Sequence, residues 1–323
     1  MPHASPRIRC LVTGAEGFVG CHLAEFLVAK GLTVYGTVQG DARNLDHIKD
    51  RLALLPCDVA DRQRVNEVAL ETKPDVVFHL AAQSLPVLSW QDPETTFRVN
   101  VMGTLHLLEA IRRAGLDSVV VVAGSSAEYS IRGQDEMPIK ESRELRPTSP
   151  YGVSKVAVDL LSRFYWQTYG MKVIRARPFF VIGPRKASDV CSDFARGIVE
   201  VEKGRSDRLR VGNLEAVRDF LDVRDAVRAL WLLAEKGTPG AVYNVCSGVG
   251  HSVREVLDIL ISLATRPIPV EPDPTRLRTA DEPVVIGDNG RLRALGWKPE
   301  IPLDRALGAV LDYWRDHRPT SLG

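Results

Sequence analysis

Tyr151 and Lys155 stand four residues apart in a segment, 150–169, whose apolar spacing predicts a helix. Residues at this spacing lie on one face of a helix. A nearby ammonium favours the ionised form of a phenol, so Lys155 should lower the pKa of Tyr151 from its ordinary value of about 10. Ser125, just after a run of four valines and an alanine, is placed to hydrogen-bond the same reacting oxygen. The trio predicts proton transfer beside a substrate oxygen.

Upstream of this trio, three glycines are spaced GxxGxxG where an expected strand, 8–13, runs into an expected helix, 18–30. The first glycine permits a tight turn, the second lets a pyrophosphate approach the backbone, and the third lets the helix lie close to the strand. Free amides and the helix dipole then attract phosphate. We expect a dinucleotide to be held by Gly14, Gly17, Phe18, Val19 and Gly20. The alternative for the glycines is a tight turn that binds no ligand. The alternative for Tyr151 and Lys155 is an exposed pair on a helix surface.

Two more segments follow expected strands at the edge where a dinucleotide would bind. Asp58-Val59 follows the strand 52–58, and the Asp58 carboxylate either accepts a hydrogen bond from an adenine amino group or caps the next helix. Leu80-Ala81-Ala82 follows the strand 75–80, and its small side chains leave room for a ligand there.

The choice between NAD and NADP depends on the end of the second strand, where an acid usually binds the ribose of NAD. This region reads Thr37-Val38-Gln39-Gly40-Asp41-Ala42-Arg43, without an acid at the strand end. Arg43 either pairs with a 2′-phosphate or is a solvated loop residue. The pattern favours NADP(H), and NAD(H) is the alternative.

The scaffold must bring the ends of several strands together. Short apolar runs alternate with helical segments over 8–176, and the strands are apolar almost throughout, as in a parallel sheet covered on both faces. This predicts an α/β fold: a Rossmann-type doubly wound parallel sheet with a smaller α/β C-terminal lobe for the substrate. We expect a dinucleotide-binding domain over 1–177, with 216–246 returning to it, and a substrate lobe formed by 178–215 and 247–323.

Composition argues against other classes of protein. The 42 Lys and Arg residues balance 41 Asp and Glu residues, so the net charge does not favour binding to nucleic acid or to an anionic membrane. Cys10, Cys57 and Cys246 lie in apolar runs and are expected to be buried free thiols, which fits a cytoplasmic protein. No leader pattern and no membrane span is expected. The seven histidines lack metal-ligand spacing, so no metal is expected, and His79 is interpreted as a core residue.

In these motifs the chain resembles the extended short-chain dehydrogenase/reductases. The matching signatures are the glycine turn, Leu80-Ala81-Ala82, Asn100, Ser125, and Tyr151 with Lys155. Within that group, four segments resemble the GDP-6-deoxy-D-mannose reductases: 149–155, 211–220, 242–248 and 276–278. The resemblance covers nearly the whole chain. The segment 211–220 discriminates best, because it lies outside the cofactor half.

The resemblance implies NAD(P)H-dependent reduction of the C4 ketone of GDP-4-keto-6-deoxy-D-mannose to GDP-D-rhamnose. Tyr151 would protonate the developing alkoxide, Ser125 would share its hydrogen bond, and Lys155 would tune Tyr151 and hold the nicotinamide ribose. The resemblance also places further residues, with Asn100 and Pro178 at the cofactor and Ser126, Arg218 and Arg278 at the GDP-sugar. The two arginines suit a diphosphate, although each could instead pair with Asp219 or Asp281. A homodimer through helices 93–114 and 150–169 is implied as well.

The sister GDP-mannose 4,6-dehydratases need a carboxylate two positions after Ser125. Here that position is Ala127, and Glu128 follows one residue later, where a strand-like segment would turn its side chain the other way. This favours simple reduction. The alternatives are a GDP-sugar dehydratase or epimerase of the same family, and a non-catalytic protein that binds a dinucleotide or a nucleotide sugar.

Three residues depart from the pattern of the resembled reductases. Phe180 stands where they have an asparagine that contacts the substrate. Arg185 and Lys186 add two positive charges near the expected diphosphate site. These positions are where an altered substrate would originate.

Overall fold

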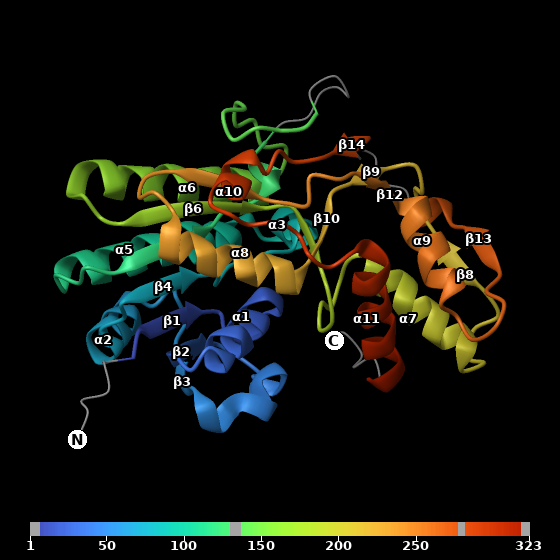
Figure 1. Cartoon of the computed structure of the whole chain (residues 1–323), viewed down its shortest axis with the longest axis horizontal. Coiled ribbons are helices and arrows are strands. Elements are labelled where there is room, and N and C mark those ends of the chain that lie inside the picture. The colour runs from blue at the N-terminus through green and yellow to red at the C-terminus, as the bar shows by residue number, and fades with distance from the viewer. Residues whose placement is uncertain (1–6, 130–136, 277–281, 318–323) are drawn as a thin grey trace.

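The computed structural model describes residues 7–129, 137–276 and 282–317. Its centre is a parallel seven-stranded sheet with the order β11-β6-β5-β4-β1-β2-β3 (Figure 1). The strands are β1 (Arg9–Thr13), β2 (Thr33–Val38), β3 (Ala53–Pro56), β4 (Val76–His79), β5 (Val119–Ala123), β6 (Val173–Pro178) and β11 (Val242–Val245). The strand order reverses between β1 and β4, and ligands of such sheets bind at this switch point. The predicted Rossmann-type fold is confirmed.

Helices cover both faces of this sheet, which explains why its strands are apolar on both sides. One face packs against α1 (Phe18–Ala29), α8 (Val223–Lys236) and α10 (Gly290–Ala294). The other face packs against α2 (Arg62–Thr72), α5 (Gly103–Arg113) and α6 (Pro150–Tyr169). The carboxyl ends of β1, β4, β5 and β6 therefore meet at one edge of a rigid layered core.

A second, smaller hydrophobic core lies at the other end of the molecule (Figure 1). It is built by α7 (Val190–Glu202), α9 (Val253–Ser262) and α11 (Leu303–Asp316), with β8 (Leu209–Val211) paired to β13 (Val270–Pro272). Short strands connect the two ends: β7 (Phe180–Ile182) with β10 (Phe220–Asp222), and β9 (Val217–Arg218) with β12 (His251–Ser252) and β14 (Val284–Val285). From β10 the chain returns to the main sheet through α8 and β11.

Some elements differ from the sequence-based expectations. The single helix expected over 93–114 is α4 (Pro93–Phe97), a π-helical turn (Arg98–Met102) and α5. The structure also contains a 3-10 helix (Arg43–Arg51), α3 (Pro86–Gln91) and a 3-10 turn (Pro274–Arg276), for which the sequence predicted no helix. The proline-rich stretch 266–276 contributes β13, because its backbone pairs with β8. Short elements of this kind form through tertiary contacts and leave a weak periodic signal.

Candidate active site

The glycine turn between β1 and α1 has the geometry of a phosphate cradle. Gly14 has a φ of +67°, which a side chain would strain, and a Cβ there would lie 2.9 Å from the Ala81 backbone. A Cβ at Gly20 would lie 2.1 Å from the Gly14 carbonyl oxygen, so only glycine lets α1 begin this close to the turn. Gly17 is the N-cap of α1 and has no side chain to cap the first amides. The backbone amides of this first turn, which include those of Phe18 and Val19, are positioned to receive a pyrophosphate.

A hydrogen-bond chain fixes the loop after β4 against this turn. The Thr13 hydroxyl accepts from the amides of Leu80 (3.1 Å) and Ala81 (3.2 Å), so its proton goes to His79 Nδ1 at 2.9 Å. His79 Nε2 donates to the Thr104 hydroxyl at 3.0 Å. Burial lowers the pKa of His79 to about 3, with the Lys155 charge acting in the same direction. His79 is a neutral core residue, as expected, and it secures the loop that contains Leu80, Ala81 and Ala82.

Asn100 lies in the π-helical turn, 1% exposed, with its side-chain amide bound to protein groups. Its oxygen accepts from the Gln83 amide (2.8 Å), and its nitrogen donates to the Gln83 carbonyl (3.1 Å) and the Ser154 hydroxyl (2.9 Å). Ser154 in turn donates to the Tyr151 carbonyl at 2.7 Å. In these contacts Asn100 ties the β4 loop to the helix that carries Tyr151 and Lys155.

Ser125, Tyr151 and Lys155 come together at the carboxyl edge of the sheet. Ser125 follows β5, and the other two residues lie in the first turns of α6. The Ser125 side chain lies close enough to the Tyr151 phenol to lower its pKa. The Lys155 Nζ donates to the Ala123 carbonyl at 2.8 Å and lies 5.9 Å from the centroid of the Tyr151 ring. The buried Ser89 hydroxyl accepts from the Tyr151 amide at 3.1 Å and so positions the start of α6.

The pKa of Tyr151 moves in the opposite direction from the one expected. Burial raises it to about 12 and the Glu128 charge adds to that rise, while the hydrogen bond from Ser125 lowers it. Burial also lowers the pKa of Lys155 to about 8, against the Glu128 charge. Four-residue spacing gave the correct neighbours, but burial decides the direction in which the pKa of Tyr151 moves. The tyrosine is therefore kept protonated, which is the form that donates a proton to an alkoxide.

The segment after Ser125 is a 3-10 turn (Ser126–Glu128) rather than the expected strand. Ser125 caps it, accepting from the Ala127 amide at 3.1 Å. Glu128 is 0% exposed, and its carboxylate turns inward to accept from the Ser125 amide at 2.8 Å. Ser126 and Ala127 are half-buried beside the trio. The methyl group of Ala127 offers no acid or base, and Glu128 points into the core.

At the position expected to face adenine, Asp58 is not the cap of the following helix. The α2 N-cap is Asp61, whose carboxylate accepts from the amides of Gln63 and Arg64. Asp58 accepts from the Ala60 amide (2.9 Å), and its second oxygen lies 3.6 Å from Arg98. The interpretation of Asp58 as a helix cap is therefore wrong, and its hydrogen bond with adenine stays a prediction.

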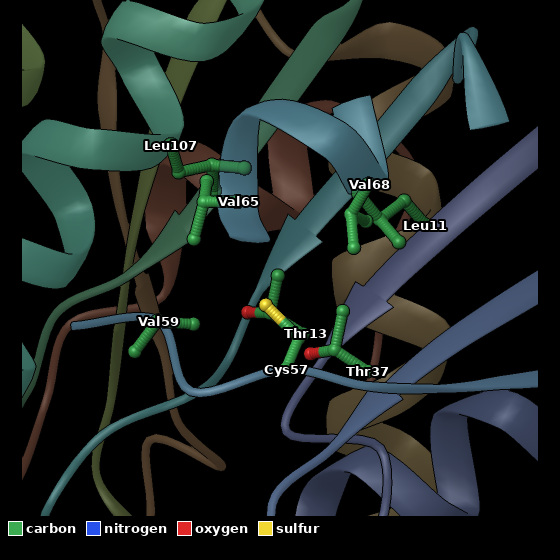
Figure 2. Close-up of a pocket in the computed structure, with 8 residues that line it drawn as sticks. All are labelled: Leu11, Thr13, Thr37, Cys57, Val59, Val65, Val68 and Leu107. Atoms are coloured by element: carbon green, nitrogen blue, oxygen red, sulfur yellow. The ribbon is translucent and has the colours of Figure 1, made fainter. Parts of the chain in front are cut away.

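A small cavity lies next to Val59, between β1, α2 and α5 (Figure 2). Its lining residues are Leu11, Thr13, Thr37, Cys57, Val59, Val65, Val68 and Leu107. Its volume of about 10 Å³ holds one water molecule at most. It is a packing gap in the core and not a ligand site.

The end of β2 carries charges of both signs. Arg43 has a 70% exposed side chain and pairs with Asp41 across two residues. Sequence reasoning missed Glu16, whose carboxylate reaches this strand end from the glycine turn and accepts from the Gln39 amide at 2.7 Å. An acid thus stands near the expected ribose position although β2 itself ends without one. The signal was present in the turn, at the residue before Gly17.

On the substrate side, Arg218 is 8% exposed, and its guanidinium lies over the Phe180 ring, 5.4 Å from the centroid. Phe180 also packs against Phe220, with 6.2 Å between ring centroids. The Asp219 carboxylate is bound elsewhere, by the amides of Ser247, Gly248 and Gly287 and by the Ser247 hydroxyl. Arg278 lies outside the described residues, and so does Asp281. Pro178 ends β6 just before Phe180.

Arg185 and Lys186 contact protein partners. Arg185 has a φ of +70° and donates to Glu25 (2.6 Å) and to the Asn44 carbonyl (3.1 Å). Lys186 donates to the Val181 carbonyl at 2.6 Å and pairs with Asp189 at 3.0 Å. These contacts fasten the loop after β7 to α1 and α7, so both charges are already balanced within the protein.

All five cysteines are buried and free, as expected for Cys10, Cys57 and Cys246. Among the described residues, no group of three or more His, Cys, Asp and Glu side chains is arranged to hold a metal ion. Within the same residues, no helix has the length and apolar character needed to cross a bilayer.

Comparison with known proteins places this architecture. The GDP-mannose 4,6 dehydratase family model matches residues 11–309. A GDP-6-deoxy-D-mannose reductase of Pseudomonas aeruginosa is 36% identical over 95% of this chain and 97% of its own length. A GDP-mannose 4,6-dehydratase of Vibrio cholerae is 30% identical over 94% of this chain and 92% of its own.

Solved structures agree. RMD from Pseudomonas aeruginosa complexed with NADPH has a TM-score of 0.83 and 35% identity, covering 96% of this chain and 99% of its own. The UDP-glucose 4-epimerase of Thermus thermophilus in complex with NAD has a TM-score of 0.85 and 30% identity, covering 95% and 99%. The glycine turn, the Ser–Tyr–Lys trio and these matches lead to one assignment: the chain belongs to the GDP-mannose 4,6-dehydratase family of extended short-chain dehydrogenase/reductases.

Proposed function

We propose that this protein reduces the C4 ketone of GDP-4-keto-6-deoxy-D-mannose to GDP-D-rhamnose, using NADPH or NADH. The observation that carries the proposal is a buried Tyr151, kept protonated beside Ser125, with Ala127 where a dehydratase needs a carboxylate. The similarity to a GDP-6-deoxy-D-mannose reductase over 95% of the chain supports it.

The trio supplies the proton side of this reaction. A reduced nicotinamide, when bound, supplies a hydride for the sugar C4, and the C4 oxygen then takes up one proton. Tyr151 donates that proton, Ser125 orients the same oxygen, and Lys155 supports the phenol and binds the nicotinamide ribose. A hydride and a proton together make the alcohol, so no further reactant is needed.

The cofactor site comprises the glycine turn, Asp58, Val59, the 80–82 loop, Asn100 and Pro178, and the sugar-nucleotide site comprises Ser126, Arg218 and Arg278. The second core, around α7, α9 and α11, is the lobe that holds the GDP part. Five unpaired thiols suit a reducing compartment, so we place the enzyme in the cytoplasm.

The direct test of function is oxidation of NADPH and NADH with freshly made GDP-4-keto-6-deoxy-D-mannose, with the sugar nucleotide analysed by NMR. We expect one cofactor oxidised per sugar reduced. Turnover of GDP-mannose without added reductant would instead identify a dehydratase. An epimerase would retain tightly bound NAD through purification and would interconvert C4 epimers. This alternative is tested because the fold is similar to that of a UDP-glucose 4-epimerase.

NADPH is the favoured cofactor, because Arg43 can exchange Asp41 for a 2′-phosphate. Glu16 opposes that charge nearby and leaves NADH usable. We expect Arg43→Ala to raise the KM for NADPH about tenfold, the worth of one charge-assisted hydrogen bond of about 1.5 kcal/mol. The KM for NADH should stay the same, since it has no 2′-phosphate. An equal rise in the KM for NADPH and NADH would show that Arg43 does not bind the 2′-phosphate.

We further propose a homodimer through α4–α5 and α6. Monomeric proteins rarely expose large apolar side chains close together. These helices expose six of them: Phe97, Met102, Val153, Leu160, Phe164 and Tyr169. Leu160→Glu, at a side chain 54% exposed, should convert a dimer to a monomer in size-exclusion chromatography with light scattering. Leu70→Glu, at an equally exposed leucine on α2, is the control and should stay dimeric. A wild-type monomer would refute the interface.

A further inference from the structure

Glu128 is a fully buried carboxylate that the proposed mechanism does not use. Its Oε1 accepts from the Ser125 backbone amide at 2.8 Å, and Ser125 in return caps the 3-10 turn that carries Glu128. Each residue therefore holds the other by a reciprocal capping interaction. The catalytic hydroxyl of Ser125 is positioned by a side chain three residues away.

The carboxylate fits because of a glycine. A Cβ at Gly124 would lie 2.2 Å from Glu128 Oε1, so only glycine leaves room for the side chain to pass under the backbone. Gly124 is itself anchored, because its amide donates to the Ala176 carbonyl on β6 at 2.7 Å. The turn is thus built around the buried carboxylate.

The second oxygen of Glu128 faces charge. Its Oε2 lies 2.7 Å from Arg177 Nε, and both side chains are at most 3% exposed. Arg177 has no acceptor to offer, so a proton on Oε2 would find no partner there. Burial raises the pKa of Glu128, and Arg177 opposes that rise. With a pKa of about 8, the group is a carboxylate beneath the active site on the alkaline side of that value.

The charged and titratable groups around this carboxylate come from β6, α6 and the turn itself: Arg177, Asp159, Lys155, Tyr151 and Tyr129. Lys155 donates to the Ala123 carbonyl, two residues before Ser125, so the ammonium and the carboxylate flank the same short segment. His79, the other group near Lys155, is neutral and adds no charge.

We propose that Glu128 is a positioning residue for the reduction, which holds Ser125 by its amide and serves as the buried counter-charge of Lys155. The inference rests on the proposed function for its kinetic consequences, and on the buried position and charge of Glu128 for its electrostatic one. The negative charge raises the pKa of both Lys155 and Tyr151. Removing it lets both groups lose their protons at lower pH, so the alkaline limb of the kcat profile should move to lower pH.

The test compares Glu128→Gln, Glu128→Ala and a control, Glu141→Gln. Glutamine keeps an acceptor for the Ser125 amide but no charge, and alanine keeps neither. Glu141 is also a buried glutamate near an arginine, but it binds the Asn244 amide and Arg291, away from Ser125. We expect kcat to fall about tenfold in Glu128→Gln and about 100-fold in Glu128→Ala, the cost of a displaced catalytic group. The alkaline limb should shift only in the two Glu128 variants.

A substrate-independent readout separates this inference from the proposed function. NMR titration of ¹³C-labelled lysine, with Lys155 assigned through Lys155→Arg, should give a lower pKa for Lys155 in Glu128→Gln than in wild type and Glu141→Gln. An unmoved Lys155 pKa would overturn the inference, and so would a kcat profile like that of the control. A wild-type enzyme inactive on the sugar nucleotide, with a shifted Lys155, would overturn the function and leave the role of Glu128 supported.

Discussion

Tyr151→Phe should lower kcat for the sugar nucleotide by about 100- to 10,000-fold, the usual contribution of a positioned general acid. The substitution removes only the phenol oxygen that Ser125 contacts. Lys155 keeps its bond to the Ala123 carbonyl, and the Tyr151 amide keeps its bond to Ser89. NADPH affinity, measured by quenching of protein fluorescence, should therefore stay within about twofold, well under 1 kcal/mol.

The matched control is Tyr165→Phe. Tyr165 is a second buried tyrosine on α6, near the C-terminal end of that helix, and its hydroxyl donates to Glu109 on α5 at 2.8 Å. Its loss should leave kcat unchanged. If Tyr151→Phe retained every measurable activity, a non-catalytic dinucleotide-binding protein would become the better description.

Asp159→Ala should destabilise the fold by about 3–5 kcal/mol, the cost of breaking a buried ion pair from one side. The Asp159 carboxylate, 3% exposed, accepts from Arg175 at 2.5 Å and from Arg177 at 2.9 Å. Removing it leaves two guanidinium groups beneath α6 with one acidic partner fewer. Urea unfolding, analysed by linear extrapolation, measures the loss.

An exposed pair provides the comparison. Asp117 lies 2.7 Å from Lys172, but its side chain is 84% exposed, and solvent screens the attraction. Asp117→Ala should cost no more than about 1 kcal/mol. Equal costs for the two variants would show that burial does not decide the strength of these pairs.

The features of this protein that could be predicted from its sequence are those encoded within a few neighbouring residues. The glycine spacing at Gly14, Gly17 and Gly20 specifies its own turn, and the Tyr151–Lys155 spacing specifies a shared helix face. The apolar strands required cover on both sides, which fixes the sheet class. Each signal is local, and the structure contains each feature.

The parts that were missed depend on contacts between distant segments. Asn100 binds Gln83 and Ser154, and nothing in its own neighbourhood indicates this. Glu128 meets Arg177 only because β5 and β6 are adjacent in the sheet. The rise in the pKa of Tyr151 follows from burial, which spacing along one helix does not specify. Local patterns predicted the reacting groups, while their burial in the folded chain determines their protonation.

The central claim is tested most directly by following the hydride. NADPH deuterated at C4 of the nicotinamide should be incubated with GDP-4-keto-6-deoxy-D-mannose and the product examined by NMR and mass spectrometry. If the protein is the proposed reductase, the product will have a single deuterium bound to C4 of the sugar, with the rhamno configuration at that carbon. Oxidised cofactor without deuterium at C4, or a product labelled only from solvent, would contradict it.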